Sequence, residues 1–267
     1  MKTYEVRPGS RVDLKKWAVS DKEAFGAGKE VGREKLLHLN KKLEALQELL
    51  YAGHRHKVLI ILQAMDTGGK DGVIRTVFEG VNPQGVRVAV FKAPTAEELD
   101  HDYLWRAHRH VPARGEMVIF NRSYYEDVLI VRVNDLVPQK IWKRRYEQIN
   151  CFERMLAEEG VTLLKFFIHI DEEEQKRRLQ ARLDDRQKHW KFDKTDLKER
   201  AKWSSYMKAY EAALSRTSTP WAPWHIIPGN SKWYRNLVIS NIIVETLESL
   251  KMKFPPPQSG LDEIVVD

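Results

Sequence analysis

The sequence predicts a doubly wound α/β domain built on a mainly parallel, five-stranded sheet. Two observations support this fold class. Five short runs rich in apolar and β-branched residues recur along the 267-residue chain, and the segments between them show helical patterning or helix-capping residues. Strands that alternate with helices form parallel sheets with helices on both faces, and ligands bind beyond the carboxyl ends of such strands.

The first half of the chain supplies three of the expected strands. A helix is expected over residues 29–51, where leucines recur at spacings of three and four residues. Helical patterning restarts at Lys70, and Thr95 with Glu98 has the pattern of a capping box that opens a helix towards Arg109. The strands are expected at residues 57–63, 86–91 and 116–120.

The second half supplies the remaining two strands and a basic helical pair. Pro138 stands where a first helical residue would, and Gly160 follows the expected end of that helix. Asp171 and Glu174 form a second capping-box pattern ahead of a basic helix. The later elements are a basic helix over about 195–216, strands over 161–170 and 224–227, a last helix over 232–250, and a proline-containing arm from 254 onwards.

Composition excludes several classes of protein. The longest apolar runs, residues 58–62 and 166–168, are far shorter than the roughly 20 residues of a membrane helix. Residues 1–21 are polar and do not resemble a secretory signal. The single cysteine, Cys151, excludes an intramolecular disulfide framework and is expected to be a buried bystander in a helix. We therefore expect a soluble, cytoplasmic protein with no membrane partner.

The positive charge is concentrated in one stretch. The formal net charge is +7, and residues 176–202 contain eleven Lys or Arg against five Asp or Glu. A concentrated basic stretch favours a polyanionic partner, although a solvated helical face has the same composition.

The loop after the first strand has the composition of a phosphate-binding loop. Residues 64–72 read AMDTGGKDG and lie between a buried strand and a helix, the context that such a loop requires. Gly68, Gly69 and Gly72 allow a tight turn and close approach to a ligand, so that N–H groups face an anion. Lys70 supplies a point charge for phosphate oxygens.

This loop departs from the standard pattern Gly-x4-Gly-Lys-Ser/Thr. Its first glycine is replaced by Ala64, and its hydroxyl residue is replaced by Asp71. Asp66 and Asp71 bracket the lysine, and carboxylates are hard oxygen ligands that suit Mg²⁺. The alternative is a glycine-rich turn with a helix-capping aspartate.

A second polar segment follows the third strand and is expected at the same edge of the sheet. Residues 120–127 read FNRSYYED. Arg122 is placed to contact a phosphate through two hydrogen bonds. Glu126 and Asp127 are candidates for binding a metal or a base edge, and Arg132 lies further along the same expected helix.

The basic helix has the features of a lid. Arg178 and Arg182 are four residues apart and so share one helix face. In small-molecule kinases a helical pair closes over the transferring phosphate and excludes water. Residues 185–194 would form the lid loop, in which Trp190 either stacks on a nucleobase or pins the loop.

Together these segments resemble the family-2 polyphosphate kinases over essentially the whole chain. The matching segments are AMDTGGKDG at 64–72, FNRSYYED at 120–127, RLQARLD at 178–184, HWKF at 189–192, APW at 222–224 and KWYR at 232–235.

The resemblance implies a P-loop kinase-like, thymidylate-kinase-like three-layer fold with a helical lid. It implies Mg²⁺- or Mn²⁺-assisted phosphoryl transfer between inorganic polyphosphate and a nucleotide. It places Asp66, Lys70 and Arg122 at the reaction centre, and it suggests phosphate contacts for Arg178 and Arg182. One domain over 1–267 is implied, with an N-terminal arm and helix over about 1–55, a lid over about 176–216 and a C-terminal arm over about 252–267. Self-association as a homodimer or homotetramer is also implied.

The nucleotide is expected to contact Asn121, Tyr125, Glu126 and Asp127. Many family members have Asp where this chain has Asn121. With Asn121 and Glu126, the chain resembles the subgroup that phosphorylates both AMP and ADP. Adenine or guanine nucleotides are the expected acceptors. The expected phosphate-binding set is Gly68, Gly69, Lys70, Asp71, Arg122, Arg132, Arg178 and Arg182, and the expected metal ligands are Asp66 and Asp71.

Two other functions share some of these features. An ATP-dependent nucleoside-monophosphate kinase would have the same loop and lid, but the position of Asp71 and the basic excess argue against it. A non-enzymatic nucleic-acid binder would use the basic stretch, but no RNA-binding signature is evident, so no nucleic-acid partner is expected.

Overall fold

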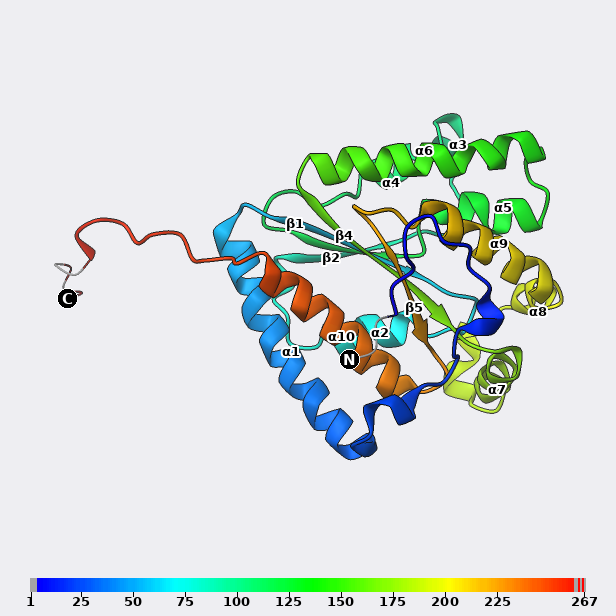
Figure 1. Ribbon diagram of the computed structural model, residues 1–267, viewed down its shortest axis with the longest axis horizontal. Coiled ribbons are helices and arrows are strands. Elements are labelled where there is room, and N and C mark those ends of the chain that lie inside the picture. The colour runs from blue at the N-terminus through cyan, green and yellow to red at the C-terminus, as the bar shows by residue number, and fades with distance from the viewer. Residues whose placement is uncertain (1–3, 262–263, 265, 267) are drawn as a thin grey trace.

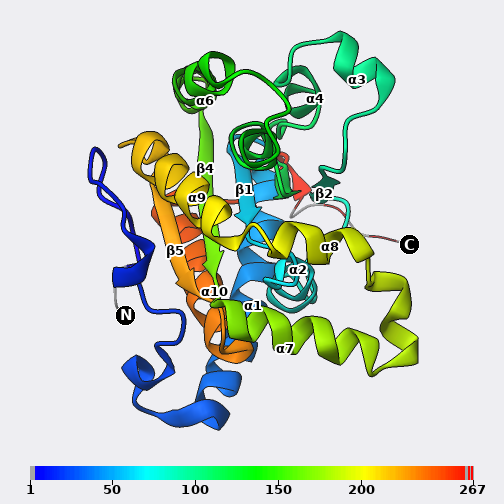
Figure 2. The same cartoon turned by 90° about the vertical axis from the view of Figure 1, so that its right-hand side faces the viewer.

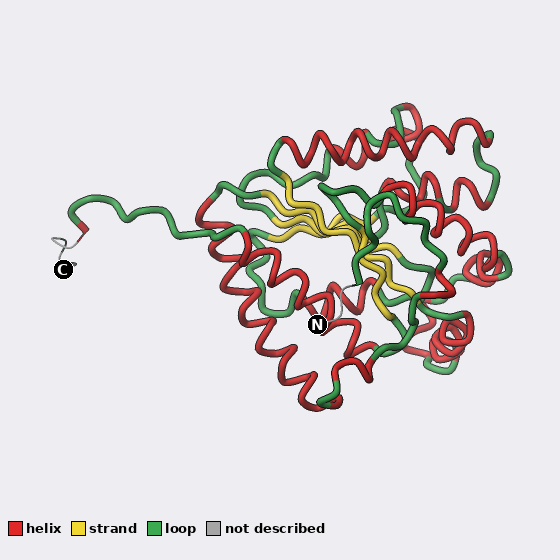
Figure 3. Tube along the Cα trace, viewed as in Figure 1, coloured by secondary structure: helices red, strands yellow, loops and turns green. Residues whose placement is uncertain are grey.

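Five strands form one sheet in the computed structural model, which describes residues 4–261, 264 and 266. The strands are β1 (Lys57–Gln63), β2 (Val86–Val90), β3 (Met117–Asn121), β4 (Val161–His169) and β5 (Trp224–Pro228). Their order is β2-β3-β1-β4-β5, and all four pairings are parallel. Figure 3 shows the strands together, with helices on either side of them. The predicted α/β class and its five-stranded sheet are therefore confirmed.

Helices cover both faces of the sheet and give the predicted three layers (Figures 1 and 2). One face carries α1 (Gly28–Gly53), α2 (Lys70–Val77) and α10 (Lys232–Ser249). The other carries α5 (Ile130–Val133), α6 (Gln139–Glu158) and α9 (Trp203–Thr217). The remaining helices are α3 (Ala96–Asp100), α4 (Trp105–His108), α7 (Glu172–Leu183) and α8 (Lys194–Arg200), with 3-10 turns η1 (Leu14–Lys16), η2 (Lys22–Phe25), η3 (Tyr124–Val128) and η4 (Arg186–Lys191).

The central strand β1 is apolar on both faces because both faces are covered. Leu59 and Ile61 pack into the core on the α6 side, whereas Ile60 and Leu62 pack into the core under α1 and α10. Alternate side chains of a strand point to opposite faces, so a strand between two helical layers reads as an unbroken apolar run.

Two expected helices are interrupted. The helix that Thr95 opens has the reciprocal capping box that was predicted, but it ends at Asp100, and α4 begins separately at Trp105. Asp102 accounts for the restart because its carboxylate accepts hydrogen bonds from the backbone N–H groups of Leu104 and Trp105.

The expected basic helix over 195–216 is two helices, α8 and α9, which break at residues 201–202. Asn134, in the loop after α5, fixes this break because its side chain accepts from Lys202 Nζ and donates to Glu199. The chain therefore changes direction where the sequence alone suggested continuity.

Three smaller expectations need correction. Asp171 caps α7 by accepting from the backbone N–H of Glu174 at 2.7 Å, but the Glu174 carboxylate binds arginines of its own helix instead of completing a box. Pro138 is the N-cap residue of α6 and not its first helical residue. Cys151 lies in α6 as expected, but it is exposed because it stands on the solvent side of that helix.

The N-terminal arm pairs with the edge of the sheet. Val6 donates its backbone N–H to Trp224 O, and Ile226 donates to Tyr4 O. The arm then reaches α9, where the N–H of Leu14 binds Glu211. The expected C-terminal arm lies partly outside the described residues, and the part that is described extends away beyond α10 (Figure 1). Among the described residues, no helix combines the length and apolarity that crossing a bilayer needs.

Candidate active site

The two polar segments predicted from the sequence meet at one edge of the sheet. Strands β1 and β3 are parallel neighbours, and Leu62 pairs in register with Asn121. The loop after β1 and the segment after β3 therefore start side by side. β1 is the central strand, and the chain adds β2 and β3 on one side of it and β4 and β5 on the other. Open α/β sheets bind their ligands where the strand order reverses in this way.

The glycine-rich loop makes a tight turn before α2. The backbone N–H of Gly68 donates to Met65 O at 2.9 Å. A Cβ at Gly68 would lie 2.5 Å from the Cβ of Ala64, so packing requires glycine at this position. Thr67 and Gly69 both have positive φ, at 61° and 109°. Such backbone strain is concentrated at ligand-binding loops.

Lys70 is the buried cation of this loop. Its Nζ donates to Ala64 O at 3.0 Å, so the side chain folds back under the turn. Burial and, to a smaller extent, the neighbouring Arg122 lower the pKa of Lys70 to about 8, while Asp66 and Glu126 oppose this shift. A lysine with this pKa is mostly protonated at pH 7.

Arg122 and Asp66 join the two segments. Arg122 Nη2 donates to Asp66 Oδ1 at 2.5 Å, across the gap between β3 and the loop after β1. Arg122 has a φ of 61°, an uncommon value that directs its side chain over the loop. Burial lowers the pKa of Arg122, but Glu126 and Asp66 outweigh that effect and raise it overall.

Asp71 and Asn121 make a second bridge between the segments. Asn121 Nδ2 donates to Asp71 Oδ1 at 2.8 Å. Asp71 is exposed and Asp66 is half-buried, so each has a carboxylate oxygen that a ligand could reach from the solvent side.

Glu126 lies in the same cluster. Burial raises the pKa of Glu126, against the lowering effects of Arg122 and Lys70. The side-chain amide of Gln63 lies between Glu126 and Ser123: its nitrogen reaches Glu126 Oε1 at 3.1 Å and its oxygen accepts from Ser123 Oγ at 3.1 Å. Gln63 thus positions Glu126, a role that sequence analysis did not assign.

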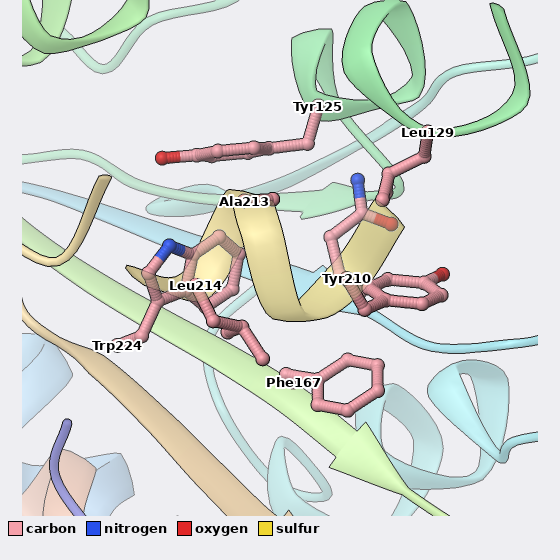
Figure 4. A pocket seen from close by; sticks show the side chains of 8 residues that line it. Tyr125, Leu129, Phe167, Tyr210, Ala213, Leu214 and Trp224 are labelled. Atoms are coloured by element: carbon pink, nitrogen blue, oxygen red, sulfur yellow. The ribbon is translucent and has the colours of Figure 1, made fainter. Parts of the chain in front are cut away.

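Tyr125 points away from this edge, which argues against its predicted contact with a nucleotide. Its side chain is fully buried, and its hydroxyl donates to Glu153 and accepts from Lys165. Figure 4 shows the ring on the wall of a small internal pocket between η3, α9 and the strands, together with Phe167 and Trp224. In this conformation Tyr125 has no polar atom at the site.

Two other predicted residues are also held elsewhere. Asp127 forms an ion pair with Arg145 at 2.9 Å, and burial raises the pKa of Asp127 to about 6 despite that arginine. Arg132 donates to the hydroxyl of Tyr146 at 3.2 Å and covers the ring of Trp142. Contacts of Asp127 and Arg132 with substrate stay predictions.

Arg178 is buried behind the glycine-rich loop. Its Nη1 donates to Thr67 O at 3.0 Å and to Gly68 O at 2.8 Å. Its Nη2 donates to Gly229 O at 2.6 Å, and its Nε donates to Glu174 at 2.6 Å. Every nitrogen of the guanidinium is thus occupied, so in this structure Arg178 fixes the loop from behind.

Arg182 lies further along α7 and faces residues 185–194, which the sequence predicted as a lid loop. Its Nη1 donates to Lys191 O at 2.9 Å and lies 3.5 Å from Asp196 Oδ2 in α8. Burial and, to a smaller extent, the charge of Asp66 raise the pKa of Asp196 to about 6. A carboxylate of α8 thus feels the charge of Asp66, an effect that the sequence did not indicate because Asp196 stands in a run of alternating charges.

Two carboxylates at this edge have the chemistry of ligands for a metal that binds together with phosphate. Magnesium is commonly held by one or two carboxylates together with water and phosphate oxygens. Asp66 and Asp71 supply that donor set. Within the described part of the chain, no cluster of three or more His, Cys, Asp or Glu side chains is arranged to hold a metal by itself.

The fold and this edge together define a P-loop kinase-like phosphotransferase scaffold. Residues 26–255 match the family model described as polyphosphate kinase 2. The chain is 57% identical, over the full length of both proteins, to an AMP/ADP-polyphosphate phosphotransferase of Meiothermus ruber. It is 46% identical to an ADP-polyphosphate phosphotransferase of Rhodopseudomonas palustris, with 95% of this chain and 92% of the relative covered.

A solved structure shows the same architecture. The crystal structure of polyphosphate kinase 2 from Arthrobacter aurescens TC1 superposes with a TM-score of 0.92 at 39% identity, covering 98% of this chain and 96% of that one. This chain belongs to the polyphosphate kinase 2 family.

Proposed function

We propose that this protein transfers a phosphoryl group from inorganic polyphosphate to AMP, giving ADP, and to ADP, giving ATP. The observation that carries the proposal is the meeting of Asp66, Lys70 and Arg122 at the carboxyl edge of β1 and β3. The full-length similarity to an AMP/ADP-polyphosphate phosphotransferase supports the choice of donor and acceptors. Transfer is reversible in principle, because the bonds broken and formed are both phosphoanhydrides.

The acceptor needs no general base. The second pKa of a phosphate monoester is about 6, so the attacking oxygen of AMP is already ionised at pH 7. Catalysis then consists of positioning and of stabilising the negative charge that spreads over the transferred group. Lys70 and Arg122 supply fixed positive charge, and a glycine-rich loop ahead of a helix is the kind of segment whose backbone N–H groups bind phosphate.

Asp66 and Asp71 are the proposed ligands of Mg²⁺ or Mn²⁺. The bound cation supplies charge neutralisation between donor and acceptor phosphates. The ion pair between Asp66 and Arg122 orients that carboxylate, and Asn121 orients Asp71. These contacts hold both carboxylates on the loop side of the sheet.

The basic stretch is the proposed track for polyphosphate. Residues 176–202 carry an excess of six positive charges, and the donor brings roughly one negative charge per phosphate. We propose that residues 176–216 act as the lid, with Arg182 on the phosphate side. Assembly as a homodimer or homotetramer and a cytoplasmic location remain part of this proposal.

The donor test is a reaction of purified protein with AMP, long-chain polyphosphate and Mg²⁺ in the absence of ATP. We expect ADP and then ATP by chromatography. ADP alone would contradict the use of both acceptors. A requirement for ATP as donor would contradict the proposal and favour an ordinary nucleoside-monophosphate kinase.

A further inference from the structure

A second arginine, Arg235, lies behind the glycine-rich loop. It belongs to the first turn of α10 and is 2% exposed. Its Nη1 lies 3.5 Å from Gly68 O, the same carbonyl to which Arg178 donates at 2.8 Å. One loop carbonyl is therefore shared by two guanidinium groups.

The guanidinium of Arg235 occupies the space that two glycines leave open. A Cβ at Gly69 would lie 2.0 Å from Arg235 Nη1, and a Cβ at Gly72 would lie 3.1 Å from Arg235 Nη2. From the sequence, these glycines were expected to let the backbone approach a ligand. In the structure, the guanidinium of Arg235 fills the space where a side chain at either glycine would begin, so Gly69, Gly72 and Arg235 pack together.

Arg235 has no carboxylate partner within ion-pair distance among the described residues. Its Nε and Nη2 both donate to the amide oxygen of Asn236, at 3.0 and 2.8 Å. Arg178, in contrast, is paired with Glu174 at 2.6 Å. Burial and, to a smaller extent, the neighbouring Arg178 lower the pKa of Arg235 to about 9. The loop is thus backed by two buried arginines and a single carboxylate.

A buried charge without a counter-ion is costly, and the cost falls when an opposite charge arrives. We propose that Arg235 is a positioning residue whose unbalanced charge, acting through the loop from behind, is compensated by the phosphate groups bound in front. It would favour the loaded loop over the empty one without touching the substrate. This inference rests on the proposed phosphate-binding role of the loop.

The test compares two variants that separate charge from packing. Arg235→Lys keeps the positive charge, whereas Arg235→Gln removes it and keeps a hydrogen-bond donor for Asn236. Thermal unfolding is measured for the free protein and with long-chain polyphosphate plus Mg²⁺, since a ligand that binds only the folded state raises the melting temperature. Steady-state kinetics give KM for polyphosphate and for AMP.

Without ligand, we expect the melting temperature of Arg235→Gln to be no lower than that of Arg235→Lys. With polyphosphate and Mg²⁺, the melting temperature of Arg235→Gln should increase by less than half of the increase that the wild-type protein shows. Its KM for polyphosphate should increase by at least tenfold, while KM for AMP stays within threefold. Arg235→Lys should show the wild-type increase in melting temperature with polyphosphate, and its KM for polyphosphate should stay within threefold of the wild-type value.

Lys165 provides a matched control, because it is an equally buried cation that does have a carboxylate partner, Glu153 at 2.6 Å. Lys165→Met should lower the melting temperature of the free protein and leave the rise with polyphosphate unchanged. The inference would be overturned if Arg235→Lys and Arg235→Gln showed the same increase in melting temperature with polyphosphate and the same KM for polyphosphate. If the wild-type protein makes no ADP from AMP and polyphosphate, the proposed function fails and this inference fails with it.

Discussion

Arg122 Nη2 and Asp66 Oδ1 are 2.5 Å apart, and this ion pair connects the end of β3 to the loop after β1. The two residues are separated by 56 positions in the sequence and meet only because their strands are parallel neighbours. The pair holds a carboxylate and a guanidinium together at the edge where the proposed transfer occurs.

Replacing Arg122 tests that edge directly. Arg122→Lys keeps a charge but loses the planar group that can contact Asp66 and a phosphate together. We expect turnover to fall by about 100-fold, the effect of removing one preorganised donor from a transition state. Arg109, an exposed arginine over the ring of Trp105, provides the control, since Arg109→Lys should leave turnover unchanged. Normal turnover in Arg122→Lys would remove Arg122 from the reaction centre.

Lys70 gives a prediction on pH. Its pKa of about 8 lies below the ordinary 10.5, so the free enzyme loses this charge as the pH rises through about 8. Because Lys70 must be charged and the acceptor phosphate of AMP must be ionised, kcat/KM for AMP should be highest between about pH 6 and pH 8 and decline above pH 8 as Lys70 loses its proton. Lys70→Ala should lower turnover by several orders of magnitude with an unchanged circular dichroism spectrum. Lys70→Arg should shift the alkaline decline to higher pH, and an unshifted decline would assign it to another group.

Arg178 and Arg182 should differ although they share a helix. Arg178 is 7% exposed and binds three backbone carbonyls at less than 3.1 Å, so Arg178→Ala should lower both the melting temperature and turnover. Arg182 faces the lid loop, so Arg182→Ala should mainly raise KM for polyphosphate. Measurements of the melting temperature and of KM for polyphosphate distinguish the two variants. The same changes in Arg178→Ala and Arg182→Ala would contradict the different roles assigned to these arginines.

Glu126 should influence the choice of acceptor. Its carboxylate lies beside Arg122 and Gln63, and we expect Glu126→Ala to change the ratio of kcat/KM for AMP to that for ADP. Glu116→Gln is the control and should leave this ratio unchanged, because Glu116 is paired with Arg87 at the opposite end of β3. Parallel assays with AMP and ADP measure the ratio, and an unchanged ratio in Glu126→Ala would end this assignment.

Tyr125 should matter for stability and not for substrate. Its hydroxyl is buried between Glu153 and Lys165, so Tyr125→Phe removes one hydrogen bond from each of these two buried charged groups. We expect a loss of about 1–3 kcal/mol in the free energy of unfolding. KM for both nucleotides should be unchanged in steady-state assays, and an increased KM for AMP would place the tyrosine in the site after all.

The strands and the main edge of the site were predictable because they follow from local patterns. Apolar runs such as β1 identify buried strands, and the carboxyl ends of parallel strands meet at one edge. Arg235 was within reach of the same reasoning, since KWYR opens the helix after β5 at that edge. Its proximity to Gly69 depends on packing between elements far apart in the sequence.

The orientation of individual side chains was not predictable. Tyr125 and Glu126 are neighbours in η3, yet one enters the core and the other faces the site, because a 3-10 turn rotates successive side chains by about 120°. The break between α8 and α9, where Asn134 binds both sides, was also not predictable, nor was the effect of Asp66 on the pKa of Asp196, because both depend on residues far apart in the sequence.

The most direct test of the central claim is the transfer of label from ³²P-polyphosphate to unlabelled AMP, without ATP, by wild-type protein and by Lys70→Ala. The account predicts that label appears first in ADP and then in ATP with the wild-type protein, and that Lys70→Ala forms labelled product at least about 100-fold more slowly. Labelled ADP at equal rates from both proteins would contradict the assignment of the loop, and no labelled nucleotide from the wild-type protein would contradict polyphosphate as the donor.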